Sequence, residues 1–378
     1  MKQSRIPRIH RALSAFCVVV GLGAGLVAHA AGAGPVPALQ VDPSWPPQLP
    51  NKWTIGQVSG LAMGAQDHIL LIHRPGSVAA DQKLAAATPP GAECCIPAPP
   101  VIEFDRSGKV VRAWGGPGAG YDWPVTEHGI HVDGKGNVWV SGVAGKDFGR
   151  ILKFTSEGKF LLQIGANLPV GQPFSNSSPD VLGRQPADMF VDLKANELFV
   201  ADGDGGASRV IVFDSETGKF KRLWGAYGEK PGELPAPRHD PDGPPSKVFS
   251  AAVHCVVEGN DGLLYICDRN GDRVQVFKKD GTFVKEKIVL PKTMGIGTAF
   301  DADFTPDQKY MYLVDGTNQQ ILLLQRDSLE IVGSFGHPGQ GAGQFRNAHS
   351  IAVDSKNNVY VSETGEGKRI QKFVPVRK

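Results

Sequence analysis

Beyond its first thirty residues the chain has no long apolar run, and over its whole length it carries little net charge. The missing apolar run excludes a membrane-spanning helix, which needs about 20 such residues. A formal net charge of +2 on 378 residues gives no electrostatic reason to expect nucleic acid or an anionic membrane as a partner. No Gly-X-Y period is present, which excludes collagen. With 47 Gly and 29 Pro, a coiled coil or helical bundle is not expected, and the composition favours many short strands joined by turns.

The first thirty residues have the pattern of a cleaved export signal. Four basic residues precede an uncharged apolar run over 12–27, and Ala28-His29-Ala30 follows as a small-residue cleavage site. The apolar run is shorter than the ~20 residues of a membrane span. We therefore expect residues 1–30 to be removed and the mature chain, 31–378, to be periplasmic or secreted. Loss of the four basic residues changes the formal net charge from +2 to −2.

Few cysteines remain after the signal: Cys94, Cys95, Cys255 and Cys267. In an exported protein such cysteines are more often disulfide-bonded than free. Cys255 and Cys267 lie on two strands joined by one turn, so a bond between them is one candidate. The adjacent Cys94 and Cys95 leave three alternatives open: a bond to each other, bonds elsewhere, or metal binding.

Internal repeats are the strongest signal in the sequence. Each repeat has a short alternating strand, a polar turn and a second alternating strand, followed by a further strand pair. The hairpins lie at 59–73, 128–142, 187–202, 254–268, 300–315 and 349–363. Four antiparallel strands repeated six times predict an all-β fold, a six-bladed β-propeller in one domain over 31–378. The last repeat has three clear strands, so we expect Ala38–Asp42 to supply the fourth and close the ring.

The consensus of the repeats is G-I-x-V-D-x-x-G-N-V-Y-V-x-D followed by R-I-x-x-F. This pattern resembles the NHL-repeat propellers. The fold by itself is a weak guide to function, so the function must be argued from the site.

Three histidines occupy the same repeat position. His128, His254 and His349 each open the inner strand of their repeat, in blades two, four and six. Alternate blades of a six-bladed ring are related by three-fold symmetry, so the three imidazoles are expected to converge on the axis. Three neutral histidines with a fourth position for water or substrate are a common catalytic zinc arrangement. The sequence therefore predicts a zinc site.

Other polar residues are expected on the same face, where second strands end. Arg74 and Arg269 follow the second strands of blades one and four, and an arginine there is suited to bind a substrate carboxylate. Asp202 and Asp268 also end second strands, but aspartate at a strand end commonly caps a turn, so we interpret both as structural. The long connection over 75–100 interrupts blade one and is predicted to form a lid-like loop over this face.

Over essentially the whole mature chain, these segments resemble the catalytic core of peptidyl-α-hydroxyglycine α-amidating lyase, a six-bladed zinc propeller. The motifs that carry the resemblance are Val58-Ser59-Gly60 with His73-Arg74, His128-Gly129 with Gly136-Asn137, Gln185-Pro186-Ala187-Asp188 with Asp202-Gly203, His254 with Asp268-Arg269, and His349. The resemblance implies that the three histidines bind zinc and that Arg74 holds a proton or the anionic end of the substrate. It also implies a tyrosine that acts as the base in C–N cleavage.

The chain departs from this family at three positions. The family tyrosine is replaced by Asp204, and the methionine two residues before the third histidine is replaced by Asn347. The aspartate that ligates a structural calcium in the family is Ser350 here, so the resemblance does not carry over a side-chain ligand for Ca²⁺. The zinc ligands and Arg74 are retained.

Replacement bases are available in the sequence. Asp204 is one candidate catalytic residue, together with Arg74. Tyr121, in the Gly-rich loop that leads to the first histidine, is another, and Asp122 and Glu127 are further alternatives. We expect the substrate to be bound by Arg74, Arg269 and Asn347.

These observations predict an exported, monomeric zinc lyase that acts on a small hydroxylated or carboxylated substrate, such as a peptide C-terminus. A first alternative is a zinc hydrolase, for example a lactonase, that uses metal-activated water. A second alternative is a non-catalytic binding propeller in which the metal is structural. Nucleotide binding and serine nucleophile chemistry are not expected, because the Gly116–Gly120 run leads into a strand and no nucleophile elbow is present.

Overall fold

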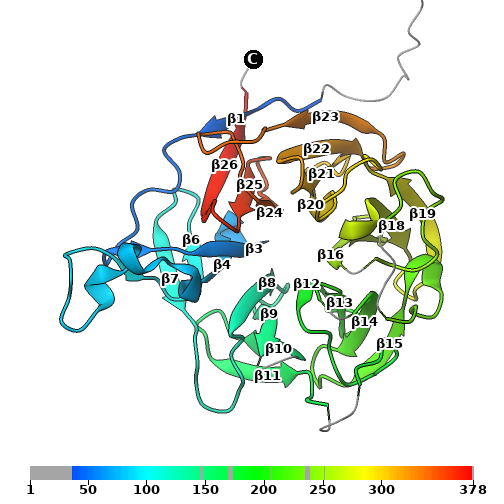
Figure 1. Ribbon diagram of the computed structural model, residues 1–378, viewed down its shortest axis with the longest axis horizontal. Helices are drawn as coiled ribbons and strands as arrows, with labels where there is room; N and C mark the ends of the chain where they lie inside the picture. Colours follow the sequence, from blue (N-terminus) through cyan, green and yellow to red (C-terminus); the bar gives the residue numbers. More distant parts are fainter. Residues whose placement is uncertain are drawn as a thin grey trace, which may run out of the picture. The chain divides into compact units, whose positions relative to one another are not determined.

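The computed structural model describes residues 36–144, 148–168, 173–205, 207–234, 239–250 and 252–376. The chain from Val36 onward forms one compact unit. It contains six four-stranded antiparallel sheets arranged around a central axis (Figure 1). The predicted all-β, six-bladed propeller is therefore confirmed. The predicted signal, residues 1–30, lies outside the described residues.

Each blade has four strands, which run in order from the axis to the rim of the ring. They are, in blade 1, β3 (Gln57–Met63), β4 (Ile69–Arg74), β6 (Val101–Phe104) and β7 (Val110–Trp114); in blade 2, β8 (Thr126–Val132), β9 (Val138–Ala144), β10 (Phe148–Phe154) and β11 (Phe160–Ile164); in blade 3, β12 (Pro186–Asp192), β13 (Glu197–Asp202), β14 (Arg209–Asp214) and β15 (Phe220–Trp224). They continue, in blade 4, with β16 (Val253–Glu258), β17 (Leu264–Asp268), β18 (Arg273–Phe277) and β19 (Phe283–Ile288); in blade 5, with β20 (Ala299–Phe304), β21 (Tyr310–Asp315), β22 (Gln320–Gln325) and β23 (Ile331–Phe335); and in blade 6, with β24 (Ala348–Val353), β25 (Val359–Glu363), β26 (Arg369–Pro375) and β1 (Leu39–Asp42).

Outside the blades, the described residues form one short parallel pair and a few 3₁₀ turns. The pair is β2 (Trp53–Thr54) with β5 (Ile96–Pro97). The turns are η1 (Ala65–Asp67), η2 (Pro75–Ser77), η3 (Ala80–Gln82), η4 (Leu84–Ala86), η5 (Ala226–Gly228) and η6 (Arg269–Gly271). None of these described helices is long and apolar enough to cross a membrane.

The hairpin turns follow from the Asp and Gly residues of the repeat. In blade 2 the carboxylate of Asp133 accepts hydrogen bonds from the main-chain N–H groups of Lys135 (2.9 Å) and Asn137 (3.0 Å). Gly136 takes a φ of 81°, a conformation that costs glycine little. Asp354 makes the equivalent contacts in blade 6. The same turn chemistry therefore sets the hairpins of the two repeats.

The apolar core lies between neighbouring blades. Six clusters of buried apolar side chains fill these spaces among the described residues, and each cluster draws on adjacent blades. Middle strands such as β9 and β21 are buried along their whole length. Because such a strand is covered on both faces, its sequence is an almost continuous apolar run.

Antiparallel order collects the inner-strand starts on one face of the ring. In blade 2 Glu127, beside the first histidine, pairs with Gly142 near the end of β9, while Val132 pairs with Val138 next to the hairpin turn. The other blades have the same order of inner and second strands. The three histidines, the ends of the second strands and the blade-to-blade connections therefore lie on one face, which we call the histidine face.

In three blades an ion pair joins the second strand to the third at the histidine face. In each, the acidic residue ends the second strand and the arginine begins the third: Asp202 with Arg209 at 2.9 Å, Asp268 with Arg273 at 2.8 Å, and Glu363 with Arg369 at 2.5 Å. Arg209 also donates to three carbonyl groups of the connection between blades 2 and 3, and neither Arg209 nor Asp202 is exposed. The pairing agrees with the structural interpretation of Asp202 and Asp268.

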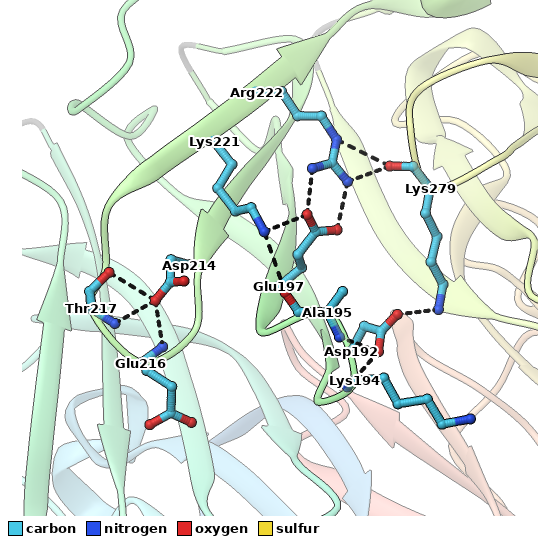
Figure 2. A network of polar contacts seen from close by, with 10 residues as sticks. All are labelled: Asp192, Lys194, Ala195, Glu197, Asp214, Glu216, Thr217, Lys221, Arg222 and Lys279. Carbon is cyan, nitrogen blue, oxygen red and sulfur yellow. Dashed lines mark hydrogen bonds and ion pairs between the residues drawn. The ribbon is translucent and has the colours of Figure 1, made fainter.

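A second polar network links blades 3 and 4 on the opposite face (Figure 2). Glu197 accepts hydrogen bonds from both Nη atoms of Arg222, at 2.6 and 2.7 Å, and from Lys221 at 2.7 Å. Arg222 also donates to the main-chain carbonyl of Lys279, whose Nζ is 2.5 Å from Asp192. The hairpin turns of the two blades are thus held together at a distance from the histidine face.

The chain start closes the ring. β1 pairs with β26 in antiparallel register, with Leu39 opposite Pro375 and Val41 opposite Phe373. Leu39 and Val41 pack against the apolar cluster between blades 5 and 6. Ala38–Asp42 was predicted to supply the outer strand of the last blade, and the observed strand starts one residue later.

Two disulfides resolve the alternatives left open by the sequence. Cys255 and Cys267 lie directly opposite each other on β16 and β17 and are bonded. Cys94 and Cys95 are bonded to each other in the connection between β4 and β6. In Figure 1 this connection lies on the outer side of blade 1, and β5 at its end pairs with β2. Near the start of this connection, the hydroxyl of Ser77 donates a hydrogen bond to the main-chain carbonyl of Arg74 at 2.7 Å.

Candidate metal centre

Three buried histidines meet on the axis of the ring. His128 on β8, His254 on β16 and His349 on β24 are 1%, 4% and 6% exposed. Their ring centroids are 4.9 to 5.0 Å apart. One ring nitrogen of each histidine lies within 4.8 Å of the corresponding nitrogens of the other two, close enough to share a metal ion. The predicted convergence of three imidazoles is confirmed.

The outer nitrogen of each ring is held by the next blade. Each Nδ1 lies within hydrogen-bond distance of the carbonyl oxygen at the equivalent repeat position: His128 and Ala187 at 2.9 Å, His254 and Phe300 at 2.6 Å, and His349 and Ser59 at 2.9 Å. A carbonyl can only accept, so Nδ1 carries the proton in each ring. In His254 and His349 the lone pair is therefore on Nε2, which is the arrangement expected of a histidine metal ligand. Nε2 of His128 lies 3.0 Å from Asp204 Oδ2, so a proton lies between these two atoms, and a metal ion bound to His128 would take its place.

The donor set fits a divalent metal ion. Nε2 of His254 is buried and has no hydrogen-bond partner among the described residues. Leaving such an atom unpaired is costly, and a metal ion would satisfy it. Burial lowers the pKa of His254 and of His349 well below the usual value, so both rings are neutral at pH 7. Neutral imidazole is the form that binds metals.

A carboxylate lies beside the three rings. Oδ2 of Asp204 is 3.0 Å from Nε2 of His128, and its Oδ1 accepts from Arg269 at 3.1 Å. Burial alone would raise the pKa of Asp204, but the hydrogen bond from His128 and the charge of Arg269 outweigh it and hold the pKa well below the usual value. The guanidinium of Arg269 lies over the ring of Phe300 at 4.9 Å. The structure thus brings Asp204 and Arg269 to the histidines.

Arg74 ends β4 and reaches toward blade 2. Its Nε donates to the carbonyl oxygen of Glu127 at 2.8 Å, and Nη1 donates to Gln57 Oε1 at 2.7 Å. No carboxylate lies within ion-pair distance of Arg74 in the described part of the chain. Burial lowers its pKa while the charges of Asp204 and Glu127 raise it, and arginine stays charged at any physiological pH. Arg74 is therefore a partly buried cation that lacks an anionic partner.

Tyr121 is not brought to the histidines. Its ring packs against Phe154 and Phe160, at centroid distances of 5.2 and 5.0 Å, in the apolar cluster between blades 1 and 2. Its hydroxyl donates to the carbonyl of Gly116 at 3.1 Å. The expectation of a base at Tyr121 is not supported, because packing of the aromatic ring with the core takes the loop away from the axis.

The two other alternative bases are also occupied elsewhere. Glu127 is buried and accepts a hydrogen bond from Trp123 Nε1 at 2.9 Å. Asp122 is exposed and accepts from Gln163 at 3.2 Å. Asp204 is the base candidate that lies next to the imidazoles.

Asn347 lies in the connection that leads to the third histidine. It has a φ of 65°, and its main-chain N–H donates to Gln319 Oε1 at 2.6 Å. Its carbonyl accepts from Thr364 at 3.0 Å. These contacts hold the main chain before His349 on the histidine face, and no contact of the Asn347 side chain with the three rings is present among the described residues.

Two further residues, which the sequence did not single out, also shape the site. Gln57 orients Arg74, and nothing in its sequence context distinguishes it. Phe300 supplies the carbonyl that holds His254, and its ring packs against His254 at 5.4 Å and His349 at 6.0 Å. Phe300 occupies the histidine position of the repeat in blade 5, so its place in the repeat is the signal that marks it.

The axis continues below the histidines as a channel lined with carboxylates. Asp188 and Asp301 border both the space under the three rings and a cavity of about 260 Å³ that Asp303 also lines. Ser350, at the position of the family's calcium ligand, donates its hydroxyl hydrogen to Asp301 Oδ2 at 2.6 Å. Burial raises the pKa of Asp301 to about 6 and that of Asp303 to about 7.

Because these carboxylates are buried, we expect the protein to lose stability as the pH rises. The folded-state pKa of Asp303 exceeds its unfolded value near 3.8, so between pH 4 and 7 the folded state binds more protons and the free energy of unfolding falls with increasing pH. Asp303→Asn should flatten this dependence and raise stability at pH 8 by about 2 kcal/mol. This is roughly half of what 1.4 kcal/mol per pKa unit implies, because the side chain borders a cavity that water can enter.

Urea unfolding at pH 4.5, 6 and 8 measures this effect. Asp327→Asn, which removes the same charge from an exposed site in blade 5, should leave the slope unchanged. Equal pH dependence of the wild type and Asp303→Asn would contradict the prediction.

Comparison with known proteins identifies two groups of relatives. NHL repeat-containing protein 3 of Mus musculus is 28% identical over 296 residues, which is 73% of this chain and 73% of the relative. A probable peptidyl-α-hydroxyglycine α-amidating lyase of Caenorhabditis elegans is 25% identical over 314 residues, 82% of this chain and 80% of the relative. No model of a known protein family matches the chain.

Among solved structures, one described as streptogramin B lyase is similar with a TM-score of 0.51 at 13% identity. The match covers 90% of this chain and 98% of that one, and it bears on the fold alone. Together with the six four-stranded sheets, these findings identify the chain as a six-bladed β-propeller that is similar both to an NHL repeat-containing protein and to peptidyl-α-hydroxyglycine α-amidating lyases.

Proposed function

We propose that the mature chain is an exported zinc-dependent lyase that cleaves the C–N bond of an α-hydroxyglycine-like group at a peptide C-terminus. The observation that carries the proposal is the convergence of three buried imidazoles on the face that also holds Arg74, a cation without a carboxylate partner among the described residues. The similarity to relatives named amidating lyases supports the same chemistry. Two disulfides support export, because disulfides persist in oxidising compartments.

Each residue of the site has a role in this reaction. Arg74 binds the substrate carboxylate, since its guanidinium has donors to spare and Gln57 holds it in place. Zinc on the three histidines would polarise the α-hydroxyl oxygen as a Lewis acid. Asp204 is ionised and accepts the hydroxyl proton, and Arg269 orients it through Oδ1.

The atoms balance without a further reactant. The hydroxyl O–H bond breaks and its proton goes to Asp204, while the C–O bond becomes the carbonyl of glyoxylate. The C–N bond breaks with its electron pair on nitrogen, which takes up one proton to give the peptide amide, so the proton released to Asp204 and the proton taken up by nitrogen cancel. No oxidant or reductant is needed.

Release of glyoxylate from N-acetyl-phenylalanyl-α-hydroxyglycine tests the proposal. The zinc-loaded protein should form glyoxylate, and Asp204→Asn should lower kcat by about 10²–10⁴-fold, the usual contribution of a general base. Arg74→Ala should mainly raise KM, by roughly 10–100-fold, through loss of a charge-assisted bond. Asp280→Asn, which removes a carboxylate from an exposed hairpin turn, is the matched control and should change neither constant.

The two alternatives give different results in the same assay. A zinc hydrolase would open a lactone and form no glyoxylate. A binding propeller with a structural metal would retain zinc and turn over neither substrate. Either result would refute the lyase.

A further inference from the structure

The histidine face carries the most exposed apolar side chains of the described residues. Val125, Met294 and Ile296 are 69%, 59% and 51% exposed, and each of the other large apolar side chains that reach the surface in the described chain is less than half exposed. All three lie in connections that lead from the outer strand of one blade to the inner strand of the next. Val125 stands alone between blades 1 and 2, whereas Met294 and Ile296 are two residues apart between β19 and β20.

The β19–β20 connection is joined to the metal centre by direct contacts. Gly297, next to Ile296, has a φ of 86° and packs so closely on Arg269 that a Cβ at this position would lie 1.9 Å from the Arg269 carbonyl oxygen. Arg269 binds Asp204, which in turn contacts His128. The connection therefore runs from the rim of the ring to the edge of the site.

A broad hollow accompanies this connection. It has a volume of about 640 Å³, and its lining includes Leu290, Pro291, Met294, Thr317 and Asn318. Thr317 and Asn318 fix the connection by hydrogen bonds to the carbonyl of Gly297 and the hydroxyl of Thr293. An apolar side chain bound in this hollow would bury Met294, which is otherwise exposed to water.

The apolar strip, Met294 and Ile296, lies across the axis from the unpaired cation. Arg74, which binds the main-chain carbonyl of Glu127, lies at the boundary of blades 1 and 2. The strip lies at the boundary of blades 4 and 5, which is the opposite side of a six-bladed ring (Figure 1). The three imidazoles lie between them. A ligand that spans the site with its carboxylate on Arg74 would direct its other end toward Met294 and Ile296.

We propose that Met294 and Ile296 form a subsite for an apolar side chain of the residue that precedes the C-terminal glycine unit of the substrate. The proposal rests on the proposed function, because it takes the carboxylate-to-amide direction of an α-hydroxyglycine peptide across the site. The preferred substrates are then peptides whose penultimate residue is apolar, such as Leu or Phe.

Calorimetric titration of the zinc-loaded protein with N-acetyl-leucyl-glycine and N-acetyl-seryl-glycine tests the subsite without turnover. The wild type should bind the leucyl probe more tightly than the seryl probe. The Met294→Ser, Ile296→Ser double variant should bind the leucyl probe about fivefold to tenfold more weakly, because apolar area is no longer buried, and the seryl probe within about twofold. Val284→Ser, Val332→Ser removes exposed apolar surface from the outer strands β19 and β23 and should change neither affinity.

Failure of the subsite and failure of the lyase are distinguishable. Equal affinities of the wild type for both probes, equal weakening of both probes in the double variant, or no binding of either probe would overturn the subsite. Selective binding of the leucyl probe without release of glyoxylate from any α-hydroxyglycine peptide would overturn the lyase and leave the subsite standing. Metal content and melting temperature equal to those of the wild type show that the double variant is folded.

Discussion

Replacement of His254 by alanine is expected to remove the metal ion from the protein. Its Nε2 is the buried ring nitrogen without a partner among the described residues, and its loss leaves two imidazoles, from blades 2 and 6, to hold the ion. Substitution of residues that only contact the metal ligands already weakens metal binding by about 10–100-fold. Loss of a ligand itself should therefore lower metal affinity by more than about 100-fold. Metal analysis after dialysis against a weak chelator should give about one zinc per wild-type chain and almost none in the variant.

A matched control separates loss of a ligand from loss of any imidazole. His337 is exposed in the connection between β23 and β24, so His337→Ala should keep its metal. Retention of stoichiometric metal by His254→Ala, or its loss from both variants, would contradict the three-histidine site.

Metal removal should also lower the stability of the wild type. A metal ion that binds only the folded state stabilises it by about 4 kcal/mol at a free concentration of 1,000 times Kd. Its three ligands come from three blades, so the ion would link elements far apart in the sequence. Chelation should therefore lower the melting temperature of the wild type and leave that of His254→Ala unchanged.

Removal of the residues up to Asp42 is expected to open the ring and cost about 4–6 kcal/mol of the free energy of unfolding. The loss includes the main-chain hydrogen bonds between β1 and β26 and the burial of Leu39 and Val41 against the cluster that contains Phe373. Opening the ring would also loosen β24, which carries the third histidine in the same sheet. Metal affinity should fall together with stability.

Urea unfolding of the truncated chain measures this effect. If truncation prevents folding, Leu39→Ala, Val41→Ala is the milder variant and should cost about 2–3 kcal/mol. Gln40→Ala, on the exposed side of the same strand, should change the free energy of unfolding by less than about 0.5 kcal/mol. Equal stability of the double alanine variant and Gln40→Ala would show that β1 does not close the ring.

The fold was predictable because its signals are local and repeated. Alternating strands and Asp- or Gly-containing turns recur six times, so an error in one repeat is corrected by the others. The same register placed His128, His254 and His349 at equivalent positions, and three-fold symmetry then required their convergence. Closure by the chain start followed from the missing fourth strand of the last repeat.

The rest of the site depends on residues outside the repeat. Tyr121 packs into the core between blades 1 and 2, because its ring finds apolar partners in Phe154 and Phe160 away from the axis. The lid-like role of the connection over 75–100 stays a prediction. In the sequence Asp204 is one of several candidate bases, and only the fold shows that it contacts His128 and Arg269.

The sequence by itself determined the number of blades, the ring closure and the three histidines, because periodic patterns encode main-chain geometry directly. The tertiary structure decided which loop residues join them: Asp204 and Arg269 beside the imidazoles, Gln57 holding Arg74, and an apolar strip across the axis. Loops carry no period, so the position of each is set by contacts with blades that are distant in the sequence.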